Sequence, residues 1–238
     1  MEKKLRKAGI IIDRTTDNII TLLCLFMFLI GIYRLYDFAY MYNSANDRST
    51  MRFKPDYSSD EAKISLPDSV AWLVLEDTTI DYPIMQGKDN IEYINKDPYG
   101  KYSLAGSIFL DTRNSPDFTD DYNLIYGHHM ESGMMFGSLD KYFKEGYLDE
   151  HRDGVLVTKD SIYRVNVFAA FHVVSTNHVI FDPGDYSVEE VMSLVRDKAE
   201  IYREPEEGCL LALSTCTNNL PDNRTIVMCT IDKPLGNM

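Results

Sequence analysis

The sequence predicts a mainly β domain, either a barrel or a sandwich, that follows one membrane-spanning helix. Eight short runs rich in β-branched and aromatic residues are bounded by Asp, Gly, Pro and Asn, a pattern typical of strands in an all-β domain. A nearly continuous apolar run lies close to the N-terminus, directly after a cluster of basic residues. The length of 238 residues, of which 45% are hydrophobic, suits one globular domain with an appendage.

The predicted strands are interrupted by three helical patterns. The strands cover residues 70–75, 80–84, 106–110, 122–126, 154–158, 161–174, 209–214 and 225–231. Lys159 and Asp160 form a predicted hairpin turn between two of them. The helical patterns cover residues 90–95, 136–144 and 187–202. The last pattern opens with Ser187 and Glu190 at the spacing of a capping box, and its apolar residues share one broad face.

The apolar run near the N-terminus predicts an uncleaved membrane anchor. Residues 19–33 are slightly fewer than the about 20 that span a bilayer, but Arg34 and Asp37 can snorkel to the interface. Because the basic residues precede this run, the N-terminus should stay in the cytoplasm and the remainder should lie outside the cell. A cleaved signal peptide is the alternative, but the nearest small-residue cleavage site, at residues 43–45, lies far downstream.

Four regions are therefore expected along the chain. A basic cytoplasmic tip covers residues 1–18, the transmembrane signal anchor covers 19–42, a polar stalk covers 43–63, and the outer domain covers 64–238. The stalk contains Ser, Asn, Asp and Lys with few large aliphatic side chains, and we expect a helix or loop within it to pack on the outer domain.

The charge and the motifs exclude several functions. The formal net charge of −13 leaves no excess of basic residues beyond the N-terminus to neutralise phosphates, which argues against a nucleic-acid partner. The sequence contains no Gly-rich phosphate loop and no dinucleotide fingerprint, so it implies no organic cofactor.

The four cysteines have different surroundings. Cys24 lies in the predicted anchor, where a thiol is a small apolar side chain. Cys209 and Cys229 lie in strand-like runs and are most simply buried thiols, or a disulfide pair if their two strands are neighbours. Cys216 remains, and an exported domain that keeps a reduced cysteine usually uses it for chemistry.

Three residues at strand ends predict acyl transfer through a thioester. Cys216 lies where an apolar run stops and a polar loop begins, so its sulfur should be accessible. Arg224 follows eight residues later at the start of the next apolar run, and His128 follows the run that ends in Gly127. A thiolate can attack a carbonyl, an imidazole can move protons, and a guanidinium can stabilise developing negative charge.

Simpler interpretations exist for each of these residues. Cys216 could be a buried strand thiol, and Arg224 a solvated charge at a strand edge. His128 and His129 should point in opposite directions along a strand, so one of the two is structural. A zinc site built from these histidines and the cysteine fits no usual ligand spacing.

The same residues resemble a known family. The run Ser214-Thr215-Cys216, the downstream Arg224 and the histidine pair after Gly127 resemble the sortases, membrane-anchored cysteine transpeptidases of Gram-positive bacteria, and among them the class B sortases. The resemblance extends over about residues 66–234 and includes the segments 72–73, 81–84, 89–90, 106–111 and 135–137. It implies an eight-stranded sortase-type β-barrel with an N-terminal helical part and a long helix between strands 6 and 7.

The resemblance also implies roles for single residues. Cys216 corresponds to the nucleophile, His128 to the catalytic histidine directly after the glycine, and Arg224 to the catalytic arginine. Substrate-binding roles fall on Asn90, Ile94 and Ser214, the first two on a short helix that lines the signal groove. No metal is implied.

A class B sortase cleaves the C-terminal sorting signal of a secreted protein after a threonine. It then transfers that protein to an amine of a peptidoglycan precursor of the lipid II type at the cell membrane.

Two other classes of protein remain as alternatives. A membrane-tethered cysteine peptidase or amidase would hydrolyse instead of transferring, and it normally places its cysteine at a helix N-terminus. Because Cys216 ends a predicted strand and an arginine follows, the sequence favours the sortase. A non-enzymatic surface protein would need no accessible thiol.

Overall fold

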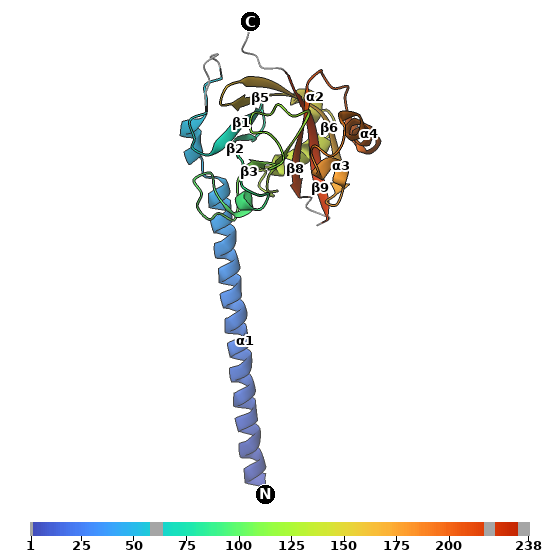
Figure 1. Cartoon of the computed structure of the whole chain (residues 1–238). Coiled ribbons are helices and arrows are strands. Elements are labelled where there is room, and N and C mark those ends of the chain that lie inside the picture. The colour runs from blue at the N-terminus through green and yellow to red at the C-terminus, as the bar shows by residue number, and fades with distance from the viewer. Residues whose placement is uncertain (1, 58–63, 217–221, 233–238) are drawn as a thin grey trace. The chain divides into compact units, whose positions relative to one another are not determined.

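The computed structural model describes residues 2–57, 64–216 and 222–232 of the chain, without the side chains of residues 2–13 and 216 (Figure 1). The predicted polar loop after Cys216, the end of the predicted stalk and the last six residues lie outside this description. The chain forms two compact units, residues 1–43 and residues 44–238.

Helix α1 (Glu2–Ala45) forms the first unit with all but its last two residues, and it includes the whole predicted anchor. Its large apolar side chains between Ile19 and Leu35 are exposed in the chain itself. The helix is long and apolar enough to cross a membrane, a criterion that N-terminal signal sequences also meet.

The second unit is a closed barrel of eight strands with one short additional strand (Figure 1). The eight strands are β1 (Ser69–Leu75), β2 (Asp81–Met85), β3 (Ile108–Leu110), β4 (Tyr122–Tyr126), β5 (Asp153–Thr158), β6 (Ile162–Val174), β8 (Cys209–Cys216) and β9 (Asn223–Ile231). They are hydrogen-bonded in the order β5-β1-β2-β3-β4-β8-β9-β6, and a β5–β6 pairing closes the barrel. All eight predicted strands, and the barrel, are thus confirmed.

The strand pairing brings three chain segments to one edge of the barrel. β4 and β8 are parallel, with Tyr126 paired to Ser214, so both strands end at the same edge. β8 and β9 are antiparallel, with Cys216 paired to Arg224, so β9 begins where β8 ends. This register gathers the ends of β4 and β8 and the start of β9.

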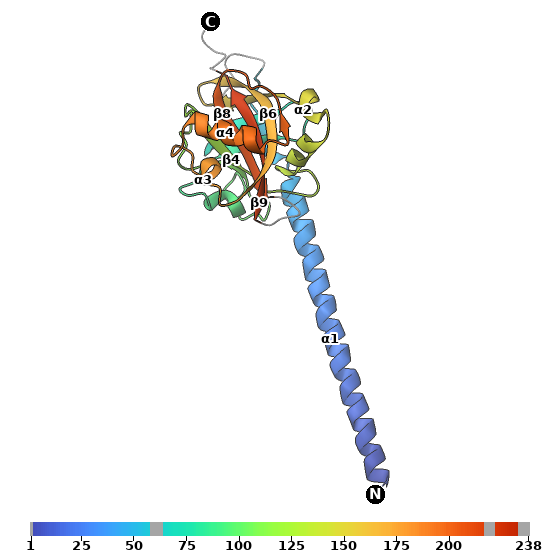
Figure 2. The same ribbon diagram turned by 90° about the vertical axis from the view of Figure 1, so that its right-hand side faces the viewer.

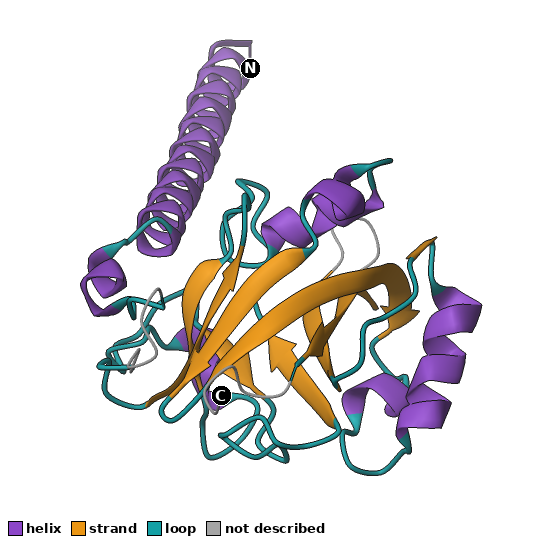
Figure 3. Cartoon of the chain, turned by 90° about the horizontal axis from the view of Figure 1, so that it is seen from above, coloured by secondary structure: helices purple, strands orange, loops and turns teal. Residues whose placement is uncertain are grey.

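Two helices cover one face of this part of the sheet. Helices α3 (His178–Phe181) and α4 (Val188–Lys198) lie against β4, β8, β9 and β6 (Figures 2 and 3). Alternate positions of the strands supply a fully apolar layer beneath them, which includes Leu124, Ala212, Met228 and Phe168. Burial of this layer fixes which face of each strand turns towards the helices, because a slip of one residue would expose it.

The segment between β6 and β8 departs from the predicted long helix. Ser187 and Glu190 form the predicted capping box, but α4 ends at Lys198 after eleven residues. Ile201 and Tyr202, placed in the helix by the sequence, form the short strand β7 (Ile201–Tyr202) and pair with β6 instead. The open edge of the long strand β6 offers backbone hydrogen bonds that outweigh the helical preference of these two residues.

Short 3-10 helices occupy the other two helical patterns: η2 (Glu92–Asn95) and η3 (Gly137–Phe143), followed by the single-turn helix α2 (Tyr147–Glu150). A further 3-10 helix, η1 (Ser49–Phe53), forms in the predicted stalk. Its Met51 and Phe53 pack against the buried cluster around Trp72, so this part of the chain packs on the domain.

No disulfide joins Cys209 and Cys229. Both lie on neighbouring strands, but Cys209 is paired with Ile231 and Cys229 with Leu211. The offset of two residues keeps the two thiols from lying opposite each other. Burial raises the pKa of the Cys229 thiol well above its ordinary value, which makes it unreactive.

Candidate active site

A cavity of about 320 Å³ lies at the barrel edge where β4 and β8 end. It is lined by Asn90, Ile94, Ser107, Phe109, Tyr126, Gly127, His128, Ser175, Phe181, Ser214, Thr215 and Arg224. Five of the six predicted site residues are therefore gathered around one pocket. The sixth, Cys216, is placed by its backbone alone.

Cys216 is the last residue of β8 and is the cross-strand partner of Arg224. It lies two positions after Ser214, which lines the pocket, and side chains alternate along a strand. Positions 214, 216 and 224 therefore belong to the same face of the sheet. This is the face that α3 and α4 cover further along, so the site begins where the helical cover stops.

His128 is held by a hydrogen bond from its ring to the backbone. The Nε2 atom lies 2.8 Å from the carbonyl oxygen of Ile94. A carbonyl oxygen only accepts, so Nε2 carries the hydrogen in this geometry. Nδ1 is then the nitrogen that can exchange a proton with a substrate, since no described residue hydrogen-bonds to it.

His129 is turned away from the pocket. Its Nε2 lies 2.7 Å from the Oδ2 atom of Asp140, and its side chain is only 6% exposed. The opposite directions of the two imidazoles agree with the alternation expected from the sequence. The pocket therefore contains one histidine of the adjacent pair.

Arg224 reaches the pocket from the start of β9, between β8 and β6. Its Nη1 atom donates to the carbonyl oxygen of Asn223 at 3.0 Å, which orients the guanidinium. A permanently charged, planar donor at this position suits the developing negative charge of a carbonyl under attack.

The hydroxyl of Ser214 is buried at the pocket wall without a hydrogen-bond partner among the described residues. Buried polar groups in proteins are nearly always hydrogen-bonded, so such a hydroxyl calls for a partner. A bound ligand in the pocket could provide it.

Of the two residues predicted on the short helix, only Asn90 lies elsewhere. Ile94 lies on η2, but Asn90 lies in the turn before it. The Asn90 amide donates to Asp111 Oδ2 at 2.8 Å, and its oxygen accepts from the Thr112 backbone N–H at 2.9 Å. Asn90 is thus held by the barrel, because its amide matches two groups at the end of β3. Asn90 lines the pocket, and its side-chain amide is used in these two hydrogen bonds.

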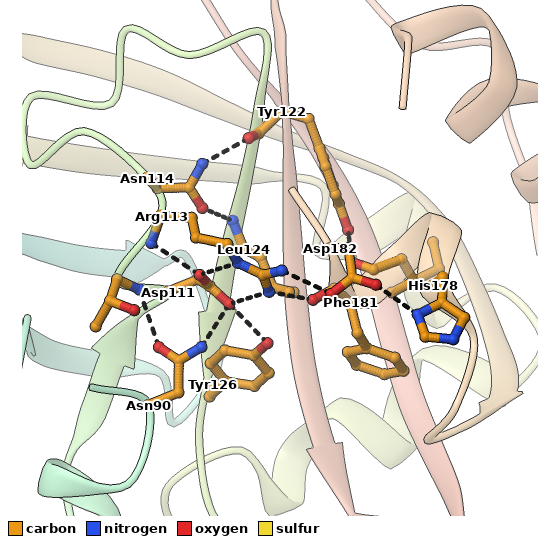
Figure 4. A network of polar contacts seen from close by, with 12 residues as sticks. Asn90, Asp111, Arg113, Asn114, Tyr122, Leu124, Tyr126, His178, Phe181 and Asp182 are labelled. Atoms are coloured by element: carbon orange, nitrogen blue, oxygen red, sulfur yellow. Dashed lines mark hydrogen bonds and ion pairs between the residues drawn. The ribbon is translucent and has the colours of Figure 1, made fainter. Parts of the chain in front are cut away.

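A buried carboxylate behind the pocket was not identified from the sequence (Figure 4). The Asp111 side chain is fully buried and accepts five hydrogen bonds, two of them from the guanidinium of Arg113 at 3.0 Å. Burial alone would raise the pKa of Asp111, but the bonds from Arg113 and Tyr126 hold it below its ordinary value. The carboxylate is therefore ionised at neutral pH.

Tyr126 belongs to the same network. Its hydroxyl donates to Asp111 Oδ2 at 2.9 Å, and burial followed by the nearby carboxylate raises the pKa of Tyr126 far above its ordinary value. The phenol therefore remains a donor, and its ring forms part of the pocket. The sequence carries a weak signal for this network, an acidic residue directly after an apolar run with an arginine two residues on.

The described residues contain no group of three or more His, Cys, Asp or Glu that could hold a metal ion.

Gly106 sets the position of η2 and therefore of the Ile94 carbonyl. Its φ is +61°, and a Cβ there would lie 2.3 Å from the Ile94 oxygen. We expect Gly106→Ala to lower the free energy of unfolding by at least about 2 kcal/mol, of which about 1–2 comes from the left-handed backbone alone. It should also reduce activity, because the oxygen that holds His128 must move.

Gly100→Ala is the matched control for this prediction. Gly100 has a φ of +78° with no atom within 4 Å of an added Cβ, so only the backbone cost of about 1–2 kcal/mol applies. Urea unfolding of both variants measures the difference. Equal losses of stability would contradict the role given to the close approach of residues 94 and 106.

Comparison with known proteins agrees with this geometry. Residues 73–232 match the sortase domain family. The chain belongs to the sortase family. Sortase B of Listeria monocytogenes is 34% identical over 155 residues, which is 63% of each chain, so the match covers slightly less than two thirds of that relative. Sortase B of Staphylococcus aureus is 29% identical over 188 residues, 76% of each chain.

Solved sortase structures share the fold. The class B sortase Spy0129 of Streptococcus pyogenes, described as involved in pilus biogenesis, superposes with a TM-score of 0.64 at 39% identity, over 69% of this chain and 92% of that one. A substrate complex of Staphylococcus aureus sortase B gives a TM-score of 0.64 at 27% identity, over 70% and 80% of the two chains. The class B resemblance inferred from the sequence is thus confirmed.

Proposed function

We propose that this sortase is a membrane-anchored cysteine transpeptidase that acts on the C-terminal sorting signals of secreted proteins. One observation carries the proposal: His128, Arg224 and Ser214 surround a single pocket at the end of the strand that terminates in Cys216. Each has the chemistry that one part of an acyl transfer requires.

In the first step, the Cys216 thiolate attacks the backbone carbonyl carbon of the signal threonine. A C–S bond forms, and the carbonyl oxygen takes the negative charge. Arg224 donates to this oxyanion, which it can do without changing its own charge. Collapse of the intermediate breaks the C–N bond and leaves a thioester on the cysteine.

His128 supplies the proton that the leaving amine needs. In the imidazolium form both ring nitrogens carry hydrogen, and the Ile94 carbonyl holds Nε2, so Nδ1–H is the group that donates. An acceptor amine then attacks the thioester, returns a proton to Nδ1, and releases the thiolate with a new amide bond. The cycle needs a thiolate and an imidazolium together, which produces a bell-shaped pH profile.

The acceptor and the location belong to the same proposal. The acceptor is an amine of a peptidoglycan precursor of the lipid II type, and α1 is the anchor that holds the domain outside the membrane with its N-terminus in the cytoplasm. The basic residues before the apolar part of α1 favour that orientation. Staphylococcus aureus sortase B has been solved with a substrate, and a sortase B has been solved with triglycine, which supports a signal and an amine as the two substrates here.

Replacing Arg224 separates its charge from its geometry. We expect Arg224→Ala to lower kcat by about 10²–10³-fold, the usual effect of removing one oxyanion donor. Arg224→Lys should recover only part of this loss, because an ammonium keeps the charge without the planar fork. Steady-state transfer of a signal peptide to an amine measures both values.

Arg203→Lys is the control, since Arg203 pairs with Asp149 and does not line the pocket. It should transfer at the rate of the unaltered protein. An Arg224→Ala variant with normal kcat would remove the guanidinium from the mechanism.

A hydrolytic cysteine peptidase is the second candidate, because the same acyl-enzyme can react with water. The two functions differ in how products depend on the amine. Raising the amine concentration at fixed peptide should convert hydrolysis product into amide product in a transpeptidase. A product mixture that stays hydrolytic at every amine concentration would favour the peptidase.

A further inference from the structure

The Asp111–Arg113 pair connects three walls of the pocket. Asn90 and Tyr126 donate to Asp111, and Arg113 donates to the backbone carbonyl oxygen of Phe181 (Figure 4). The three contacted residues all line the pocket, although they come from the turn before η2, from β4 and from α3. The ion pair itself lies behind these walls.

The guanidinium of Arg113 is divided between the barrel and the segment after α3. Its Nε and Nη2 atoms bind the two oxygens of Asp111, while Nη1 donates to Asp182 at 2.6 Å. Asp182 also binds its own helical neighbour His178 at 2.6 Å, a contact within the segment. Arg113 thus ties residues 181 and 182 to a different part of the chain.

Neighbouring residues of the segment 181–184 line two different cavities. Phe181 lines the pocket described above, whereas Arg113, Pro183 and Gly184 line a second cavity of about 440 Å³. The preceding residue, Ile180, is already anchored, because it is fully buried beneath α4 and accepts from the Tyr122 hydroxyl at 2.8 Å. The hydrogen bonds from Arg113 to Phe181 and Asp182 therefore hold the residues that follow the buried Ile180.

We propose that Arg113 is a positioning residue that fixes residues 181–183 as the wall between the two cavities. The position of this wall sets the size of the sorting-signal side chain that the pocket accepts. This inference rests on the proposed function, since it concerns selection of the signal. Arg113 itself touches no reacting atom.

The geometry requires an arginine for this task. Three nitrogens of one planar group reach Asp111, Asp182 and the Phe181 carbonyl together. A lysine ammonium is a single point donor and cannot join these partners in the same arrangement. A glutamine keeps a polar side chain but loses the charge. Arg113→Lys thus removes part of the hydrogen bonding to Asp111, Asp182 and Phe181. Arg113→Gln removes the charged interaction entirely.

Hydrogen exchange of the full-length protein in detergent tests the wall without using activity. The Phe181 and Asp182 amides donate to the Asn177 and His178 carbonyls in α3. In Arg113→Gln these two amides should exchange about tenfold faster or more, the effect of losing one hydrogen bond to a charged group. Arg203→Gln is the matched control, since it removes another arginine–aspartate pair that lies outside both cavities.

Kinetics with pairs of signal peptides that differ by one methylene group next to the threonine test the selection. In Arg113→Gln the KM should rise about tenfold, and the preference between the two peptides should fall about tenfold, the discrimination that one methylene provides. The kcat and the alkylation rate of Cys216 by iodoacetamide should remain within about threefold, because the reacting groups are unchanged. In Arg113→Lys, the KM and the peptide preference should lie between those of Arg113→Gln and those of the unaltered protein.

The outcomes separate this inference from the proposed function. Unchanged exchange at Phe181 and Asp182 in Arg113→Gln would overturn the inference whatever the peptides do. Faster exchange with an unchanged peptide preference would also overturn it, because the wall would then not select. If the Phe181 and Asp182 amides exchange faster in Arg113→Gln but no peptide acylates the protein, the role of Arg113 in holding residues 181–183 would be supported. The proposed transpeptidation would be contradicted.

Discussion

Cys216→Ala should form no acyl-enzyme, and transfer of a signal peptide should fall on the order of 10⁴-fold or more, as when the nucleophile of an acyl-transfer enzyme is removed. The physical reason is that the sulfur forms the covalent bond of the first step, and a methyl group cannot. Among the described residues, Cys209 lies at the opposite end of β8 and Cys229 is fully buried, so neither can take the place of the Cys216 sulfur. Intact mass after incubation with peptide measures the adduct.

Cys209→Ser is the control for this prediction. Cys209 does not line the pocket, so its replacement should leave acylation unchanged. Binding of the peptide to Cys216→Ala should persist, because the pocket walls are untouched. An adduct on Cys216→Ala would move the nucleophile to another residue.

His128→Ala should lower kcat by about 10²–10⁴-fold, the range of a positioned general acid. The imidazole is oriented by the Ile94 carbonyl, 2.8 Å from Nε2, so that Nδ1 can deliver its proton to the leaving amine. His128→Gln retains a hydrogen-bond donor for the same carbonyl but cannot titrate. The pH profile of this variant should therefore lose one of the two limbs seen in the unaltered protein.

The adjacent His129 provides the matched control. Its ring binds Asp140 outside the pocket, so His129→Ala should lose stability but keep kcat and both limbs of the pH profile. If His129→Ala lost activity and His128→Ala kept it, the roles of the two histidines would be exchanged.

Most of the barrel could be predicted from the sequence because each strand is an apolar run bounded by residues that end strands. The strand ends also located the site, since Cys216, Arg224 and His128 all lie where such a run begins or stops. Ser187 and Glu190 predicted the start of α4 correctly, because a capping box is a local pattern.

The features that escaped prediction depend on contacts between distant segments. Ile201 and Tyr202 fit a helix locally but pair with the open edge of β6, which lies about thirty residues earlier in the chain. The tie between Arg113 and Asp182 joins residues 69 positions apart, so no local pattern announces it. For the same reason Asn90, assigned to the groove by resemblance, was not recognised as a partner of Asp111.

The most direct test of the central claim follows a single covalent species. The full-length protein in detergent is incubated with signal peptides that contain a threonine at the cleavage position, and its intact mass is recorded before and after addition of triglycine or diaminopimelate. We expect a thioacyl adduct that maps to Cys216 and that the amine converts into a new amide product. An adduct that disappears only by hydrolysis, or one that maps to a different residue, would contradict it.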